Sequence, residues 1–206
     1  MLSFIAIVLL LFLIPGPAVI ITITQTLKSG KKNGIYTALG IGLGDLVHTL
    51  AAVLGLSAIL MKSATAFEVV KYIGGVAYLV YLGIQMLLTK PKKIEQPTVE
   101  QSPASTSFRQ GFLAEILNPK TALFFLAFLP QFVQHNEQSV TSQLLTLGIT
   151  FVVMSALYTI LLAVITSFIG EKIFTKTSGS SRWLEKTVGF VYIGLGVRLA
   201  LQTQSR

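Results

Sequence analysis

The chain has 206 residues, of which 52% are hydrophobic and only 12% charged, and its mean hydropathy is +0.73. Such a composition is too apolar for a soluble globule, so we predict an all-α integral membrane protein. The absence of cysteine excludes disulfides and thiolate metal sites. The formal charge of +8 is spread over short loops, which does not resemble the basic patch of a nucleic-acid-binding protein.

Six apolar stretches are close to the roughly 20 residues that a spanning helix needs. They cover residues 2–26, 35–60, 67–89, 112–134, 142–169 and 186–203, and the last is the shortest. The first lacks the basic start and the cleavage pattern of a signal peptide, so we expect it to remain as a span. Little chain is left for a soluble catalytic domain, so a functional site is expected among the helices.

The basic residues of the predicted loops alternate in number between the two sides. One side carries Lys28, Lys31, Lys32, Lys90, Lys92, Lys93, Arg109, Lys172, Lys176, Arg182 and Lys186, and the other carries Lys62, Lys71 and Arg206. The excess of positive charge on the cytoplasmic side of membrane proteins places the first set in the cytoplasm and both termini outside.

The loop between the third and fourth spans divides the chain into two halves. It is rich in Pro, Ser, Glu and Gln, so we predict a flexible cytoplasmic linker at 90–111 between a first three-helix half, 1–89, and a second, 112–206. The segment YLGIQMLL (81–88) faintly resembles GLGVRLAL (194–201). Three helices per half predict a 3+3 inverted repeat, a layout common in secondary transporters.

The motif Pro15-Gly16-Pro17 interrupts the first span. Proline removes a backbone donor and clashes with the preceding turn, so two prolines around a glycine should open the helix completely. In lipid such a break is tolerated only where it is buried in protein or lines a wet cavity. The alternative interpretation is a kink that improves packing.

The second span contains small, acidic and imidazole side chains close together. Gly40 and Gly44 share a face and allow another helix to approach closely, either within the bundle or between two copies of the chain. Asp45 is the only aspartate, and a carboxylate inside a membrane segment is by default a functional candidate. His48 lies on the same side of the helix, as a proton relay or as a packed core residue.

The fourth span contains a second break at Asn118-Pro119-Lys120. A lysine in a membrane segment costs roughly 2.5 to 3.5 kcal/mol on insertion scales, so Lys120 needs a partner unless it snorkels to the surface. Counted from the cytoplasmic helix ends at about 1.5 Å per residue, both breaks and Asp45 fall near the midplane. This arrangement favours a substrate site for a small zwitterion.

Other polar residues of the spans have less defined roles. The same count places Glu115 closer to the cytoplasmic end and Arg198 near the midplane, although Arg198 would equally well snorkel outward. Ser155, Thr159 and Thr166 share one face of the fifth span, which either helix packing or the lining of a pathway would explain.

With these motifs, the chain resembles the LysE/RhtB family, the bacterial lysine, homoserine and threonine exporters. The resemblance rests on IPGPAVII in the first span, SGKKNGIYTALGIGLGDLVHTL through the second, and FRQGFLAEILNPKTALFFLAFLPQFV in the fourth. It implies export of amino acids or their derivatives across the bacterial plasma membrane, in exchange for protons and without a cofactor. The family's motif positions correspond to Pro15, Gly16, Pro17, Gly40, Gly44, Asp45, Asn118, Pro119 and Lys120.

One departure from the family concerns the residue after Pro-Gly-Pro. Many members have an acidic or amide residue there, whereas this chain has Ala18, which favours neutral over basic substrates. Asp45 is then the expected proton site. An intramembrane aspartyl protease would need a second midplane acid, and a metal-ion exporter would need more ligands than two histidines and one midplane acid offer. A purely structural role would leave both helix breaks unexplained.

Overall fold

The computed structural model describes residues 1–63, 75–88, 102–134 and 139–174, together with the isolated positions 65, 69, 193, 194 and 197. The regular elements of this part are all helical: α1 (Leu2–Leu13), α2 (Pro17–Lys62), α4 (Gly75–Leu88), α5 (Ala104–Ile116), α6 (Pro119–Leu123), the π-helix η2 (Phe124–Phe128), the 3-10 helix η3 (Leu129–Phe132) and α7 (Val140–Phe174). The predicted sixth span with Arg198, the sequence echo at 194–201 and the linker before residue 102 lie, except for these isolated positions, outside the described residues.

The long helix α2 folds back on itself at Gly30. This residue has a φ of 84° and a ψ of 174°, a backbone conformation that residues other than glycine rarely adopt. A Cβ atom on Gly34 would collide with the hydroxyl of Thr26, although eight residues of continuous helix would separate the two by about 12 Å. The chain therefore turns here, and α2 consists of a first arm, 17–29, and a second arm, 31–62. The turn lies in the loop predicted between the first two spans.

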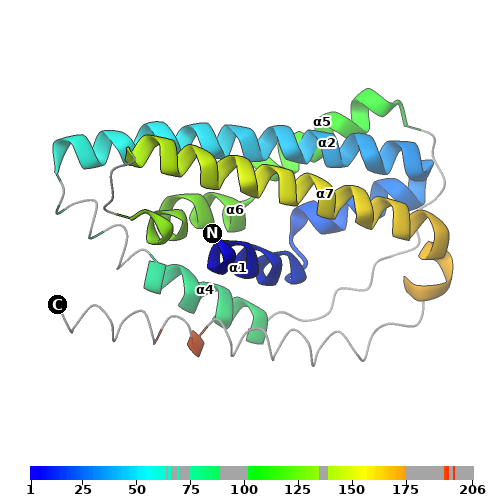
Figure 1. Ribbon diagram of the computed structural model, residues 1–206. Coiled ribbons are helices and arrows are strands. Elements are labelled where there is room, and N and C mark those ends of the chain that lie inside the picture. The colour runs from blue at the N-terminus through cyan, green and yellow to red at the C-terminus, as the bar shows by residue number, and fades with distance from the viewer. Residues whose placement is uncertain are drawn as a thin grey trace.

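The second arm of α2 lies in the middle of a layer with α5 and α7. It runs parallel to α5, because Gly40 lies against Phe108 and Gly44 against Glu115. It runs antiparallel to α7, as Figure 1 shows along the length of the molecule. The contacts that establish this direction pair Gly34 with Ala163, Gly42 with Ala156 and Gly148 with Thr49.

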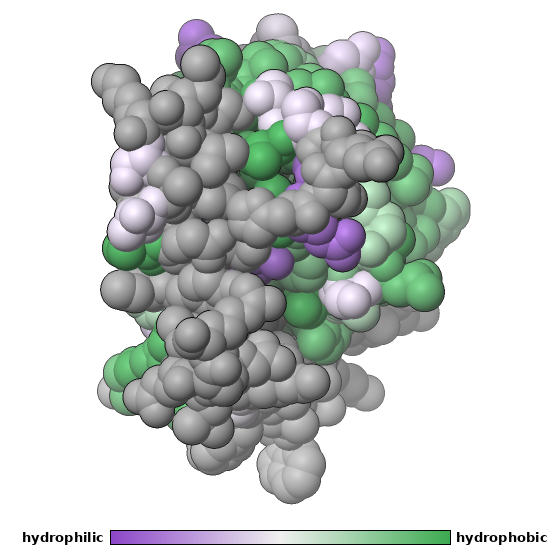
Figure 2. Space-filling model, turned by 60° about the vertical axis from the view of Figure 1, so that its left-hand side comes forward, coloured by the Kyte–Doolittle hydropathy of each residue, from purple (hydrophilic) through white to green (hydrophobic). Residues whose placement is uncertain are grey.

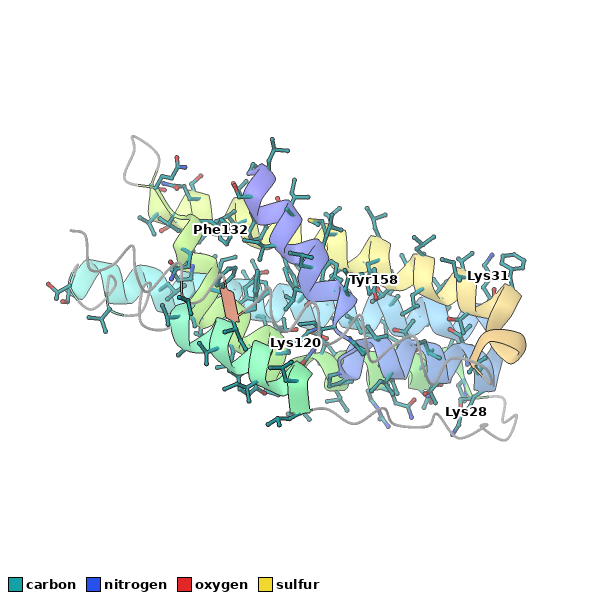
Figure 3. All side chains as sticks on the ribbon, turned by 90° about the horizontal axis from the view of Figure 1, so that it is seen from below. Lys28, Lys31, Lys120, Phe132 and Tyr158 are labelled. Carbon is teal, nitrogen blue, oxygen red and sulfur yellow. The ribbon has the colours of Figure 1, made fainter. Side chains whose placement is uncertain are left out.

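An aromatic core fills the end of the bundle opposite the turn at Gly30. It is made by α1, η2, the far end of the second arm and the beginning of α7. Its largest buried side chains are Phe4, Phe124, Phe125 and Phe151, with Phe12 at its edge. Figure 3 shows the labelled Phe132 at this end and Lys28 and Lys31 at the other, with Lys120 and Tyr158 between them.

Two described helices are long and apolar enough to cross a membrane. They are Pro17–Leu56, which contains the turn at Gly30, and Val140–Phe168. The pair Ala104–Ile116 and Pro119–Phe132, bent by 44°, makes a third if it is one broken span. Large apolar side chains such as Leu54, Leu157 and Phe168 face outward, and hydrophobic residues cover much of the described surface in Figure 2. An all-α membrane protein is the class that these features support.

The helix before the second break begins earlier than residue 112, where the fourth span is predicted to start. Helix α5 starts at Ala104, so residues 104–111, assigned to the flexible linker, are helical. Their composition is polar, but the helix gains its stability from packing, since Gly111 lies against the backbone of Thr37. The prediction failed here because a polar helix that is held by tertiary contacts carries no apolar run.

Candidate substrate site

The first span opens at Pro15 and Gly16, between the end of α1 and the start of α2. Ile14 is extended, with a φ of −80° and a ψ of 113°, and Pro17 begins the next helix. Helix α1 therefore ends with carbonyl groups that lack their regular α-helical partners, although the oxygen of Leu11 accepts a hydrogen bond from the amide of Ile14 at 3.2 Å. The opening predicted for this motif is present.

Lys120 satisfies the carbonyl groups at the end of α1. Its Nζ atom donates to the oxygen of Leu11 at 3.1 Å and to the oxygen of Ile14 at 2.9 Å. Its side chain passes over Gly16, where an added Cβ would lie 3.4 Å from Nζ. The two helix breaks, more than a hundred residues apart in the sequence, thus meet, and the Lys120 ammonium stabilises the C-terminal end of α1.

Asn118 builds the second break. Its Oδ1 atom accepts a hydrogen bond from the amide of Lys120 at 3.1 Å, as the cap of α6. Its Nδ2 atom donates to Oγ1 of Thr121 and to Oε2 of Glu115, both at 3.1 Å. Asn118 therefore links the end of α5 to the start of α6 and fixes the base of the Lys120 side chain. Pro119, at the first position of α6, is exposed.

Asp45 is fully buried in the second arm of α2. Neither of its carboxylate oxygens has a hydrogen-bond partner among the described residues. The side chains of Glu115, Ser155 and Lys120 line the same cavity as Asp45. Buried polar groups are normally hydrogen-bonded, so an unpartnered carboxyl group marks a place where a proton or a ligand can bind.

These groups surround a cavity of about 30 Å³, which holds about two water molecules. The polar part of its lining is formed by Gly16, Asp45, Glu115, Asn118, Lys120, Thr121, Ser155 and Thr159. The remaining lining consists of Leu11, Phe12, Ala18, Phe151 and Tyr158. Of the predicted substrate residues, Gly16, Asp45, Asn118 and Lys120 meet here, whereas Pro15, Pro17 and Pro119 are exposed and do not line the cavity.

His48 lies beside the cavity but does not line it. Its Nε2 atom is 2.9 Å from the backbone oxygen of Glu115, and its ring stacks on Phe125 with the centroids 6.1 Å apart. This geometry is that of a residue which fixes α5 against α2. A part in proton transfer stays a prediction.

Glu115 is the cavity residue that the sequence interpretation misplaced. Counting the fourth span from residue 112 predicts Glu115 at another level than Asp45, whereas α5 begins at Ala104 and brings Glu115 beside Asp45. Glu115 is 2% exposed and shares the cavity with Asp45, so the bundle holds two acids at this level. Its position three residues before Asn118, on the same helical face, was the available signal.

The small residues of the second arm pack against α5 within the same chain. A Cβ atom on Gly40 would overlap the backbone oxygen of Phe108, and one on Gly44 would lie 2.7 Å from Cβ of Glu115. Both glycines therefore bring Asp45 close to α5. In the fifth span, Ser155 and Thr159 line the cavity, whereas Thr166 is buried and is not part of the lining.

Comparison with known proteins gives one family. A family model described as a LysE type translocator matches residues 9–203. The uncharacterized membrane protein YrhP of Bacillus subtilis (strain 168) is 32% identical over 210 residues, which cover 98% of each chain. A leucine efflux protein of Klebsiella pneumoniae is 28% identical over 191 residues, 92% of this chain and 89% of that protein. A leucine efflux protein of Enterobacter sp. (strain 638) is 27% identical over 189 residues, 91% of this chain and 89% of that protein. No solved structure matches the chain.

Proposed function

Because the chain belongs to the LysE type translocators, a family of membrane-embedded amino-acid exporters, we propose that it exports neutral amino acids from the cytoplasm in exchange for protons. The observation that carries the proposal is the shared cavity of Asp45, Glu115 and Lys120 beside the two helix breaks. Two acids and one ammonium can bind the ammonium and the carboxylate of a zwitterion at the same time.

The chemistry of the cavity favours a neutral substrate. Ala18 belongs to the lining, together with the rings of Phe12 and Tyr158, which stack with their centroids 5.1 Å apart. None of these three side chains offers a carboxylate or an amide to a cationic substrate side chain, and the Lys120 ammonium repels a cationic side chain. A substrate with an apolar side chain fits this wall, in agreement with the names of the two leucine efflux relatives.

The cavity must enlarge to admit an amino acid, because it has room for about two water molecules. The helix breaks supply the necessary freedom, since the opening at Pro15 and Gly16 has no continuous hydrogen-bond ladder to disrupt. We expect the substrate to displace the Lys120 ammonium from the oxygens of Leu11 and Ile14 and to bring its own charges to the cavity. Asp45, with no partner of its own, is the group proposed to carry the proton on the return step.

The orientation of transport follows from the basic loops. Asn33, next to the first loop, donates to the backbone oxygen of Ser102 at 2.6 Å, and the Lys31 ammonium lies 5.5 Å from the ring centroid of Phe168. These contacts bring the turn at Gly30, the start of α5 and the end of α7 to one end of the bundle. We propose that this end, which carries the Lys28, Lys31 and Lys32 group, faces the cytoplasm.

The test is to measure every amino acid in the medium by mass spectrometry after loading cells with mixed dipeptides. Cells express the wild type, Asp45→Asn or an empty vector, and membrane levels of both proteins are compared. We expect the wild type to release one or a few neutral amino acids faster than the empty vector and Asp45→Asn to lose the response of export to pH. Release identical to the empty vector would reject the proposed cargo, and unchanged pH dependence in Asp45→Asn would reject Asp45 as the proton site.

A further inference from the structure

A second polar feature leads away from the cavity toward the turn at Gly30. On the first arm of α2, Thr22 and Gln25 follow the cavity residue Ala18 at helical spacing and are buried. On α5, Gly111 and Ser107 precede the cavity residue Glu115 at the same spacing, and both are buried. The buried residues Thr22, Gln25 and Ser107, together with the exposed Gln110, are called the polar column below.

The two sides of the polar column face each other and are joined by hydrogen bonds. The amide of Gln25 donates to Oε1 of Gln110 at 2.6 Å, and the hydroxyl of Ser107 donates to Oε1 of Gln25 at 3.2 Å. Between Ser107 and Glu115 the helix rises by about 12 Å, so the column extends from near the cavity toward the basic end of the bundle.

The other side of the cavity has the opposite character. There Phe12 and Phe151 of the cavity lining continue into the aromatic core around Phe124 and Phe125. Phe151 stands 5.0 Å from Phe125 and 5.1 Å from Phe124, measured between ring centroids. The cavity is thus closed by aromatic rings on one side and by a few amide and hydroxyl groups on the other.

We propose that the polar column is the path by which the substrate reaches the cavity, and that the hydrogen bonds of Gln25 close it in this state. Polar side chains inside a membrane bundle either join helices or line a path for a polar solute. Their helical spacing from the cavity residues Ala18 and Glu115, on the side of the basic loops, favours the path. Separating Gln25 from Gln110 and Ser107 exposes amide and hydroxyl groups, which water can solvate. Opening the other side requires the packed aromatic rings of the core to separate.

The absence of cysteine from the chain permits a direct test by single-cysteine labelling. Thr22→Cys and Thr49→Cys form a matched pair, because each threonine is buried and donates to the carbonyl four residues before it, of Ala18 and Asp45 respectively. Thr22 lies in the polar column and Thr49 lies beyond Asp45, on the aromatic side. Ser107→Cys is a second column position, and the unsubstituted protein reports background.

Each variant is treated with a charged, membrane-impermeant methanethiosulfonate in inside-out and in right-side-out vesicles, and leucine export is measured in parallel. We expect Thr22→Cys and Ser107→Cys to react about ten times faster than Thr49→Cys in inside-out vesicles. Leucine should slow that reaction in both column variants.

The path is proposed for the cargo of the proposed function, and the labelling and export results test the path and the cargo separately. Equal labelling of Thr22→Cys and Thr49→Cys, with leucine export intact, would overturn the path and leave the exporter. Fast labelling of the column positions alone, without export of any neutral amino acid, would support the path and reject the proposed cargo. Fast column labelling confined to right-side-out vesicles would support the path and reverse the proposed orientation.

Discussion

Replacement of Lys120 by methionine tests the joining of the two helix breaks. Methionine is similar in length to lysine, so the change removes the ammonium while leaving most of the packing against Gly16. The oxygens of Leu11 and Ile14, both in buried residues, then lose the Lys120 donor, although the Leu11 oxygen keeps the hydrogen bond that it accepts from the amide of Ile14 at 3.2 Å. Each buried carbonyl left without a partner costs about 1 to 3 kcal/mol. Because the Leu11 oxygen retains a partner, the cost comes mainly from the Ile14 oxygen, and we expect a loss of about 1 to 3 kcal/mol in the free energy of unfolding.

The loss can be measured by titrating the purified protein in mild detergent with sodium dodecyl sulfate and following helix content by circular dichroism. Lys120→Arg is the matched control, because it keeps a cation that can donate to both oxygens, and it should lose less than half as much stability. Leucine export should be absent in Lys120→Met and reduced in Lys120→Arg. A Lys120→Met protein with wild-type stability would show that the ammonium does not hold the end of α1, and the reasoning from the two hydrogen bonds would fail.

Three further substitutions probe the same region. Gly16→Ala should export at close to the wild-type rate, since its Cβ would lie 3.4 Å from Nζ of Lys120. Gly16→Val should displace the Lys120 side chain and reduce export in the dipeptide assay. Equal export by the alanine and valine variants would contradict the contact between Gly16 and Lys120. Gly40→Val should destabilise the protein by several kcal/mol on detergent titration, because its side chain overlaps the α5 backbone, and normal stability would refute that close approach. The double change of Pro15 and Pro17 to alanine should preserve membrane insertion and abolish export, and wild-type export would reduce the motif to a packing kink.

The sequence alone determined the class of the protein and the places where its helices are interrupted. These features are local: an apolar stretch of spanning length, or a proline that removes a backbone donor, acts through its immediate neighbours. The motifs at Pro15–Pro17, around Asp45 and around Asn118, taken in this order, indicate the family, which the match over residues 9–203 confirms. The extent of α5 was misjudged, because its polar first turns are stabilised by the second arm of α2 and not by their own composition.

Only the tertiary structure decided what the interrupted helices contact. The depth of Glu115 depends on the register between α5 and the second arm, which is set by the close approach at Gly40 and by Gly111. The partner of Lys120 is a pair of carbonyl oxygens in α1, and nothing in its own segment specifies them. The physical reason is that helix periodicity places side chains on faces, whereas the level at which two faces meet is decided by how closely their backbones can pack.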